Sequence, residues 1–448
     1  MGPARTFTPP CGPVIGNVDG AIIRALGIPY ATARRFDPPA PYPDWQEPRD
    51  ASQPAPACPQ PARPEITPIF GDQTGDLPLQ EECQNLSVTV PADLRDGEQL
   101  PVMVWIHGGS YVVGAGDSPI YDPTKLVTEQ RVVFIAVTYR LGVLGYLGGP
   151  GKTANLGLLD QQRALEWVQR NIASFGGDPA RVTAFGHSAG GDAVAHLMAT
   201  PQPERLFTRA IIQSSPFGLL HGRAEMYRAM AEAGASFDET TPIDELPAAQ
   251  LAVVMAALPF GLNAGMAFGP QYGAAPLPPE DAVEKAWDAA APHIDVLVGS
   301  TAEETRVFIP TIPITAKLAG IPLVGGVLSS LASKVLTRKM YTAGARRFVD
   351  RHTRAGGTAY RYTFTWAPRG NHFGATHAID VPFLFGNRET WGDSLLLRGA
   401  APETIEAHGK AMRQVWADFA RGDEPKPGAD LRDVLKITRA RGARRRVT

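Results

Sequence analysis

The sequence predicts an α/β fold built on a mostly parallel central sheet, and three observations support this. Short apolar runs rich in β-branched residues recur along the chain, helical patterns lie between them, and no fixed-period repeat divides the sequence. The runs are nearly continuous in apolar residues, as expected for strands that are covered on both faces. We expect strands at Pro101–Ile106, Val132–Thr138, Val182–Phe185, Ala210–Gln213, Ile294–Val298 and Thr358–Thr365.

The clearest helix lies between two of these strands. Residues 156–172 carry apolar side chains at multiples of three and four, at Leu158, Leu165, Val168 and Ile172. This spacing predicts a helix with one apolar face, and the turn sequence at residues 176–179 ends it. Alternation of strand and helix is typical of βαβ units, in which a crossover helix joins two parallel strands.

The 448 residues are expected to form one domain with two insertions. Residues 224–278 are rich in Ala and Met and predict helices, and residues 309–345 form the second insertion. Both are expected to cap the site. Residues 53–78 are rich in Pro and predict a long surface loop. Residues 432–448 carry seven basic side chains and are interpreted as a solvated or disordered tail.

Charge and hydropathy exclude several functional classes. The 45 acidic and 43 basic side chains nearly cancel, so charge indicates neither a nucleic-acid partner nor a membrane surface. The uncharged stretch between Lys317 and Lys334 is interrupted by Pro322 and is too short to span a bilayer. The first ten residues lack the apolar region of a secretory signal. We therefore expect a soluble protein, with its compartment and oligomeric state left open.

The chain contains only three cysteines, Cys11, Cys58 and Cys83. They are too few for a four-cysteine zinc site and can form one disulfide at most. From composition alone, the simplest interpretation is three unpaired buried thiols. No metal and no cofactor is expected.

The motif Gly186-His187-Ser188-Ala189-Gly190 carries the strongest catalytic signal. It follows the predicted strand Val182–Phe185 and precedes a helical run at Asp192–Met198. A Gly-x-Ser-x-Gly sequence is required where a strand turns sharply into a helix, because the serine backbone is strained and larger neighbours would clash. The sequence therefore predicts Ser188 as a nucleophile, with the Ala189 N–H at the helix N-terminus as a donor to developing negative charge.

A second glycine-rich loop, His107-Gly108-Gly109-Ser110, follows the predicted strand Pro101–Ile106. An enzyme that transfers acyl groups must stabilise a tetrahedral oxyanion, and small residues allow backbone N–H groups to approach it. We expect Gly109 and Ser110 to supply these donors, with Gly108 forming the turn. The alternative is an ordinary turn between a strand and a helix.

The nucleophile requires a base, and the base requires an acid that orients it. In α/β-hydrolases the acid and then the histidine follow the serine in the chain. His377 lies among small residues after the strand Thr358–Thr365 and is the preferred base, with His372 as its nearest competitor. The acid is expected after the strand Ile294–Val298, where the residues alone leave Glu303 and Glu304 as alternatives.

With these motifs in order, the chain resembles the type-B carboxylesterases, the family of the cholinesterases and the bacterial para-nitrobenzyl esterases. The resemblance extends over about residues 13–425. Besides the motifs above, the residues that carry it are Gly27-Ile28-Pro29-Tyr30-Ala31, Arg35-Phe36, Pro38-Pro39, Ala57-Cys58-Pro59-Gln60, Glu81-Glu82-Cys83-Gln84-Asn85-Leu86, Asn155-Leu156-Gly157-Leu158-Leu159-Asp160-Gln161, Phe175-Gly176-Gly177-Asp178-Pro179 and Val381-Pro382-Phe383-Leu384-Phe385-Gly386.

The resemblance implies an α/β-hydrolase fold and several site assignments. It assigns the acid to Glu304 and implies a disulfide between Cys58 and Cys83. It also matches Ser214 and Asp380 to positions that help to hold the acid and the histidine.

The chain departs from the family pattern close to the site. His187 replaces the usual Glu before the serine and so removes a negative charge near the catalytic histidine. Ser110 and Ala378 replace usual glycines, and Thr305 replaces the Gly after the acid. No Trp lies between Cys58 and Cys83 to stack on a quaternary ammonium group, so choline esters are not the expected substrates.

These observations favour a serine carboxylesterase that hydrolyses short-to-medium acyl or aryl esters of small molecules through an acyl-enzyme intermediate. Two alternatives are weighed against it. One is a non-catalytic binding or adhesion protein on a hydrolase scaffold, which the intact serine, acid and histidine disfavour. The other is an amidase or acyltransferase, which shares the first half-reaction and which the sequence does not separate from an esterase.

Overall fold

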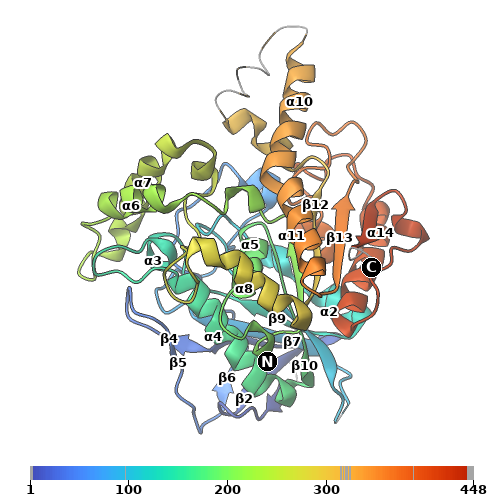
Figure 1. The fold of residues 1–448 in the computed structure, drawn as a ribbon. Coiled ribbons are helices and arrows are strands. Elements are labelled where there is room, and N and C mark those ends of the chain that lie inside the picture. Colours follow the sequence, from blue (N-terminus) through green and yellow to red (C-terminus); the bar gives the residue numbers. More distant parts are fainter. Residues whose placement is uncertain are drawn as a thin grey trace, which may run out of the picture.

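A computed structural model describes residues 4–95, 97–312, 315, 317, 321, 324–386 and 388–440. A large twisted sheet crosses the molecule, and helices cover both of its faces (Figure 1). Along the sheet the strands follow the order β1-β2-β3-β7-β9-β8-β10-β11-β12-β13-β14, with β6 paired to β2. The strands are β1 (Ala4–Phe7), β2 (Val14–Asp19), β3 (Ile22–Pro29), β6 (Arg49–Asp50), β7 (Asn85–Pro91), β8 (Leu100–Ile106), β9 (Val133–Val137), β10 (Gly177–His187), β11 (Arg209–Gln213), β12 (Asp295–Thr301), β13 (Ala359–Phe364) and β14 (Leu435–Arg439). A separate two-stranded sheet pairs β4 (Ala31–Thr32) with β5 (Ala40–Pro41).

The predicted α/β class is confirmed in the centre of the sheet. The six predicted strands are β8 to β13, and all of their mutual pairings are parallel. Their residues are almost all buried, because helices cover both faces. The carboxyl ends of parallel strands meet at one edge of a sheet, so the loops that follow β8, β10, β12 and β13 are brought together there.

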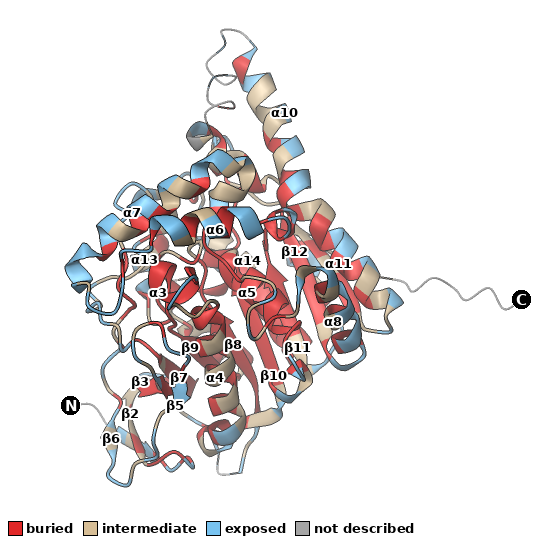
Figure 2. Cartoon of the chain, turned by 60° about the vertical axis from the view of Figure 1, so that its left-hand side comes forward, coloured by how far each residue is buried: buried red, intermediate tan, exposed pale blue. Residues whose placement is uncertain are grey.

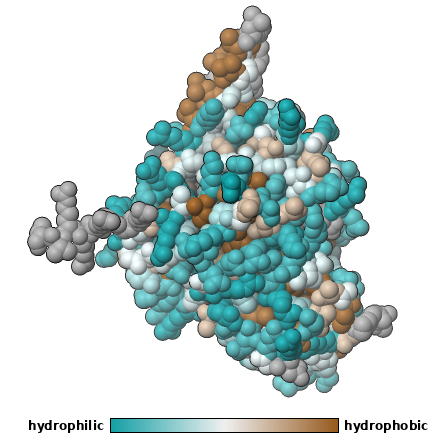
Figure 3. All heavy atoms as spheres, turned by 90° about the vertical axis from the view of Figure 1, so that its right-hand side faces the viewer, coloured by the Kyte–Doolittle hydropathy of each residue, from teal (hydrophilic) through white to brown (hydrophobic). Residues whose placement is uncertain are grey.

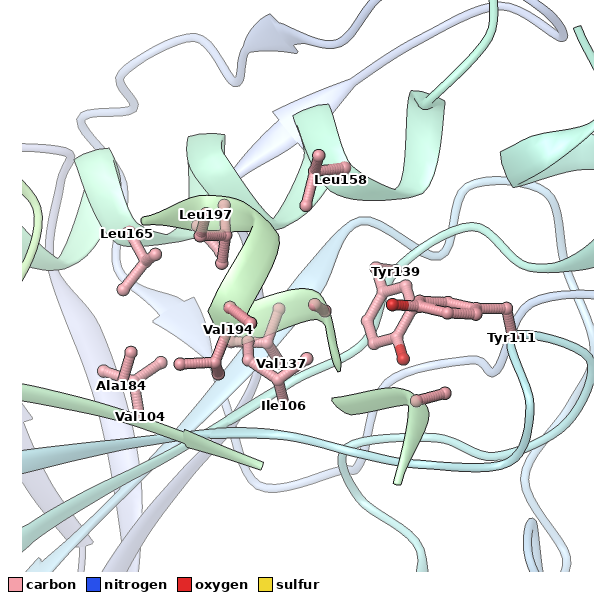
Figure 4. Close-up of a cluster of buried hydrophobic side chains, with 14 of the residues drawn as sticks. Val104, Ile106, Tyr111, Val137, Tyr139, Leu158, Leu165, Ala184, Val194 and Leu197 are labelled. Carbon is pink, nitrogen blue, oxygen red and sulfur yellow. The ribbon is translucent and has the colours of Figure 1, made fainter. Parts of the chain in front are cut away.

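The helices are α1 (Thr67–Phe70), α2 (Thr124–Gln130), α3 (Gly142–Tyr146), α4 (Leu156–Asn171), α5 (Ala189–Leu197), α6 (Ala224–Ala233), α7 (Leu246–Ala257), α8 (Val283–Ala290), α10 (Gly325–Thr337), α11 (Ala343–Arg354), α12 (Val381–Leu384), α13 (Arg388–Trp391) and α14 (Pro402–Arg421). The helix predicted at residues 156–172 is α4. Its Leu158 and Leu165 are fully buried. They lie on the side of α4 that faces α5 and the sheet residues Val104 and Ala184 (Figure 4).

The sequence patterns missed the amino-terminal part of the sheet. Strands β1, β2, β3 and β7 pair antiparallel with one another in sequence order. Strand β7 joins them, again antiparallel, to the parallel centre through β9. Several residues of β2 and β3 are only half-buried, so these strands lack the continuous apolar run of the central strands.

The predicted basic tail is wrong for its first part. Residues 435–439 form strand β14, which pairs antiparallel with β13 from Tyr360↔Arg439 to Phe364↔Leu435. Leu435 is buried, whereas Lys436, Thr438 and Arg439 are exposed. The basic side chains therefore concealed an edge strand. The remaining residues of the predicted tail, 441–448, lie outside the described residues.

The two predicted insertions lie beyond the carboxyl ends of the central strands. Helices α6 and α7 come from the first insertion and α10 from the second, and both views place them on that side of the sheet (Figures 1 and 2). Strand β12 is followed directly by the 3₁₀ helix η9 (Glu304–Thr311). Residues 313, 314, 316, 318–320, 322 and 323 of the second insertion are outside the described residues.

A longer apolar stretch than the one between Lys317 and Lys334 occurs in the first insertion. Residues 246–279 carry no charge. An overlapping segment, Ile243–Met266, has the length and the hydropathy of a membrane-crossing helix. The mean hydropathy of its most apolar window is 1.5, and 22% of that window is buried. The stretch consists of α7 between two 3₁₀ helices and is broken at Gly261. Leu246 and Val253 on α7 are buried, while Leu251 and Met255 are exposed.

Candidate active site

Ser188 lies at a sharp turn between β10 and α5. Its backbone angles, φ 58° and ψ −122°, are outside the regions that non-glycine residues normally adopt. The turn is held by hydrogen bonds from the Ser188 N–H to the Gln213 carbonyl (2.8 Å) and from the Asp192 N–H to the Ser188 carbonyl (2.9 Å). A Cβ atom on Gly190 would lie 1.9 Å from the Ile106 carbonyl oxygen. The flanking glycines are therefore required by close packing, as the motif predicts.

The loop after β8 lies directly against this turn. A Cβ atom on Gly108 would lie 2.7 Å from the His187 carbonyl oxygen and 3.3 Å from the Ser188 Cβ. The next three residues, Gly109, Ser110 and Tyr111, all have positive φ, so the loop curls tightly beside the serine. Ser110 reaches φ 57° although it replaces a usual glycine. The four predicted oxyanion residues, Gly108, Gly109, Ser110 and Ala189, thus come from two elements that touch each other.

His107 anchors this loop in the interior. Its ring stacks on Tyr139 with ring centroids 4.4 Å apart, and the Tyr139 hydroxyl donates a hydrogen bond to the His107 carbonyl (2.7 Å). Complete burial lowers the pKa of His107 to about 4, so the ring is neutral. It supports the loop without adding charge beside the serine.

His377 and Glu304 form a short, buried pair. Strand β12 ends three residues before Glu304, and His377 lies between β13 and α12. The distance between Glu304 Oε2 and His377 Nδ1 is 2.5 Å. The second carboxylate oxygen of Glu304 accepts the Thr301 N–H (2.8 Å), and the Glu304 carbonyl accepts the His377 N–H (3.2 Å). Glu304 is fully buried, so its carboxylate is fixed on the imidazole.

The structure decides both of the alternatives that the sequence left open. Glu303 turns away from the imidazole, bonds Arg306 (2.8 Å) and accepts the Ala375 N–H (3.1 Å). His372 is exposed and packs on Phe373. Glu304 and His377 are therefore the acid and the histidine that meet at the carboxyl edge of the sheet.

Three rings surround His377. His187 lies 4.6 Å away between ring centroids, Phe308 5.4 Å and Tyr341 5.5 Å. His187 precedes the serine on the elbow, whereas Phe308 and Tyr341 come from the segment after β12. Sequence reasoning missed Phe308 and Tyr341, because no local motif marks an aromatic residue that packs on a distant histidine.

His187 and Asp380 form a second buried pair beside the first. The distance between His187 Nε2 and Asp380 Oδ1 is 3.9 Å. Burial and repulsion from His377 hold the pKa of His187 well below its ordinary value of 6.5. Burial and repulsion from Glu304 raise the pKa of Asp380 from 3.8 to about 7. His187 therefore contributes no positive charge near neutral pH, and Asp380 is only partly ionised there.

Asp380 and Ser214 were expected to help to hold the acid and the histidine, but among the residues that the structure describes neither side chain forms a hydrogen bond with Glu304 or His377. Asp380 accepts a hydrogen bond from Gln213 Nε2 (3.4 Å) and lies beside His187 rather than bonding His377. Ser214 is fully buried with φ 50°, and its Oγ has no hydrogen-bond partner within the described part of the chain.

The disulfide implied by the resemblance is wrong for this structure. Cys58 and Cys83 are free thiols, and so is Cys11. The first two are fully buried against each other, and contact with Cys58 together with burial raises the pKa of Cys83 well above 9.0. The Leu141 N–H also bonds Cys58 Sγ (3.3 Å). The resemblance thus located two neighbouring side chains correctly, but they pack as thiols.

One further buried link joins the two glycine-rich elements. The Tyr111 hydroxyl, from the loop after β8, donates to Asp192 Oδ2 on α5 (2.6 Å). Both side chains are fully buried, so this hydrogen bond fixes the oxyanion loop to the helix that begins after Ser188. The only local signal for it is an acidic residue inside a helix that is otherwise mostly apolar.

A cleft of about 260 Å³ lies on the same side of the sheet as this centre. Gly218 and Leu219 in its wall follow the end of β11, and Met340 precedes Tyr341, whose ring contacts His377. The lining mixes apolar and polar residues and consists of Gly218, Leu219, Phe260, Leu262, Asn263, Lys339 and Met340. A larger cleft of about 380 Å³ includes Leu100, the first residue of β8, and therefore lies at the opposite edge of the sheet from Ser188.

The parallel sheet, the serine elbow and the paired acid and histidine define an α/β-hydrolase. Comparison with known proteins then gives the family: the carboxylesterase family profile matches residues 5–320. The chain therefore belongs to the carboxylesterase family and is a carboxylic-ester hydrolase of the type-B group.

Relatives with known names cover nearly the whole chain. The chain is 36% identical to a probable N-octanoylanthranilate hydrolase from Rhodococcus erythropolis, over 93% of this chain and 92% of that protein. It is 31% identical to the para-nitrobenzyl esterase of Bacillus subtilis, over 92% and 89% respectively. Among solved structures, a thermophilic para-nitrobenzyl esterase superimposes with a TM-score of 0.80 at 28% identity, covering 97% of both chains.

Proposed function

We propose that this carboxylesterase works through an acyl-enzyme intermediate on Ser188. Ser188 Oγ attacks the ester carbonyl while His377 Nε2 takes its proton, and His377 then returns the proton to the departing alcohol oxygen. In the second half-reaction, water attacks the acyl-enzyme while His377 takes its proton. The carboxylic acid product then leaves and Ser188 is regenerated. The single observation that carries this assignment is the 2.5 Å contact between His377 Nδ1 and Glu304 Oε2, because it fixes the ring and stabilises the imidazolium that forms.

The tetrahedral oxyanion requires donors that are already in position. The backbone N–H groups of Gly109, Ser110 and Ala189 fit this role. Ala189 begins α5, so its N–H has no acceptor within the helix. Gly109 and Ser110 lie on the loop that packs against Ser188 through Gly108. The Tyr111–Asp192 hydrogen bond supports this arrangement by joining the loop to the helix.

We propose short-to-medium acyl or aryl esters as the substrates. The cleft supports this, since its Leu219, Phe260 and Met340 suit a hydrocarbon chain or a ring, and its volume of about 260 Å³ is small. Among the relatives, one is named for para-nitrobenzyl esters, and the name of another contains an octanoyl group, which supports the acyl length alone.

An amidase is the second candidate, and one observation favours it. The name of the Rhodococcus erythropolis relative denotes an N-acyl substrate. The same Ser188, His377 and Glu304 would carry out this reaction, with His377 returning its proton to a leaving nitrogen. The non-catalytic alternative is disfavoured, because the chain keeps the serine at the elbow turn and the contact between Glu304 and His377.

The proposal is tested by hydrolysis of para-nitrophenyl acetate, butyrate and octanoate. Ser188→Ala and His377→Ala are each expected to lower kcat/KM by about 10³-fold or more, because the triad acts as one unit. His372→Ala is the matched control and should retain the wild-type rate, since that ring is exposed.

Two outcomes would contradict the proposal. A loss of less than about tenfold in Ser188→Ala would remove the serine mechanism. A higher kcat/KM for octanoyl amides than for para-nitrophenyl octanoate would favour the amidase function over the esterase function.

A further inference from the structure

Helix α10 is built in the reverse of the usual pattern, with polar residues toward the body and apolar residues toward solvent. Ser333 and Thr337 are buried, and both bond Thr305 at the base of the helix. The Thr305 hydroxyl donates to the Ser333 carbonyl (2.9 Å), and the Thr305 N–H donates to the Thr337 hydroxyl (3.2 Å). Polar contacts therefore help to hold the base of this helix to the body, together with Leu336, which packs against the main core.

The opposite face of α10 is an exposed apolar stripe. The exposed fractions are 48% for Val324, 72% for Val327, 58% for Leu331 and 58% for Val335. These residues are spaced by three and four positions, which places them on one side of a helix. The helix stands out from the molecule, and its surface is apolar over much of its length (Figures 2 and 3). Single exposed apolar residues are ordinary, but a continuous stripe on a projecting helix indicates a partner.

Cations lie on the same face, closer to the body. Lys334 and Arg338 are exposed and fall within the same arc of the helix as Leu331, because Lys334 is three and Arg338 is seven positions further on. Val327 and Lys334 are separated by seven residues, or about 10 Å along the axis. The arm therefore has an apolar outer part and a basic inner part.

The chain segment that contains α10 carries charges of one sign only. From Thr305 to Val349 the sequence contains no Asp and no Glu. Seven basic residues occur there: Arg306, Lys317, Lys334, Arg338, Lys339, Arg346 and Arg347. A second copy that packed on this face about a two-fold axis would bring Lys334 and Arg338 toward their own counterparts, with no carboxylate in the segment to offset them. An anionic surface carries the complementary charge.

We propose that the α10 arm docks the enzyme on an anionic lipid surface. Val327, Leu331 and Val335 enter the boundary between headgroups and acyl chains, and Lys334 and Arg338 meet the lipid phosphates. Interfacial helices lie in the plane of the membrane surface, with an apolar face buried about 5–10 Å and basic residues at the headgroups, and the stripe and the two cations of α10 supply both features. The base of α10 bonds Thr305, the residue after Glu304, so a docked arm holds the active site next to the lipid surface.

Vesicle flotation of the whole protein tests the proposal. The probes are phosphatidylcholine vesicles with and without about one-third phosphatidylglycerol, at low and high salt. The wild type is expected to float with the anionic vesicles, and high salt or pure phosphatidylcholine is expected to weaken this binding at least about tenfold.

Two variants separate the parts of the arm. The triple variant Val327→Ser/Leu331→Ser/Val335→Ser and the double variant Lys334→Glu/Arg338→Glu should each lose at least about tenfold in vesicle partition. The matched control Leu251→Ser/Met255→Ser changes two exposed apolar residues of α7 and should bind as the wild type does. Turnover of soluble para-nitrophenyl butyrate checks that every variant is folded.

Three results would overturn the proposal. If the wild-type protein fails to float with anionic vesicles, α10 does not bind an anionic lipid surface. If the triple variant floats as well as the wild type, the lipid-binding residues lie outside the apolar stripe of α10. A wild-type dimer that the triple variant converts to a monomer in sedimentation would assign the stripe to a second copy of the chain.

Discussion

Two regions at the same end of the sheet follow opposite rules of burial. In the catalytic centre, the ionisable side chains of Glu304, His377 and Asp380 are buried. On α10, more than twenty residues further along the chain from Glu304, Val327 and Leu331 are exposed while Ser333 and Thr337 are buried. Both regions reverse the ordinary sorting of side chains by hydropathy.

The two reversals differ in how their energetic cost is met. The buried carboxylate of Glu304 has hydrogen-bond partners for both oxygens, His377 and the Thr301 N–H, whereas burial and Glu304 raise the pKa of Asp380 to about 7. Buried charge is tolerated only when it is paired in this way. The exposed stripe of α10 has no such compensation within the described residues, so its partner is expected outside the chain.

The largest expected effect separates two adjacent carboxylates. Glu304→Gln should lower kcat/KM by about 10²–10⁴-fold, because the amide cannot stabilise the His377 imidazolium and favours the wrong tautomer. Glu303→Gln should retain activity within about threefold, since Glu303 bonds Arg306 and the Ala375 backbone instead. Equal losses in the two variants would show that the centre is not fixed by Glu304 alone.

The second prediction compares a leucine under the centre with a leucine on the arm. Leu165→Ala on α4 should lower the free energy of unfolding by about 2–5 kcal/mol, because the side chain is fully buried. Leu331→Ala on α10 should change it by less than about 0.5 kcal/mol. Urea denaturation of both variants measures the difference. A cost above about 2 kcal/mol at Leu331 would mean that the stripe is covered within the protein itself.

The third prediction concerns the pH dependence of stability at Asp380. Its pKa is raised from 3.8 to about 7 in the folded protein, so the native state binds this proton more tightly than the unfolded chain does. The associated stability is present below about pH 4 and is lost as the pH rises through about 7. Relative to Asp380→Asn, the wild type should therefore lose up to about 4 kcal/mol between pH 4 and pH 8.

Urea unfolding at several pH values measures this difference. Asp393→Asn, at an exposed carboxyl, is the control and should parallel the wild type. A constant difference between Asp380→Asn and the wild type across this range would mean that Asp380 titrates normally.

Much of the site could be predicted from the sequence because its signals are local. The Gly-x-Ser-x-Gly motif must sit at a strand-to-helix turn, and Ser188 does. The rings of Phe308 and Tyr341 against His377, and the Tyr111–Asp192 bond, carry no such signal, because each joins residues far apart in the chain. Strand β14 was missed because a segment with many basic residues also suits a solvated tail.

The sequence by itself determined the α/β class, the six central strands, helix α4 and the serine elbow. Each of these depends on hydrophobic periodicity or on steric demands within a few residues. Only the tertiary structure placed the carboxylate of Glu304 rather than that of Glu303 on His377, a choice that the family resemblance had implied and the residues alone left open. It also left Cys58 and Cys83 as thiols and turned the apolar side of α10 outward. Those outcomes depend on which distant groups meet, and a helix with one polar and one apolar face does not specify which of them faces the body.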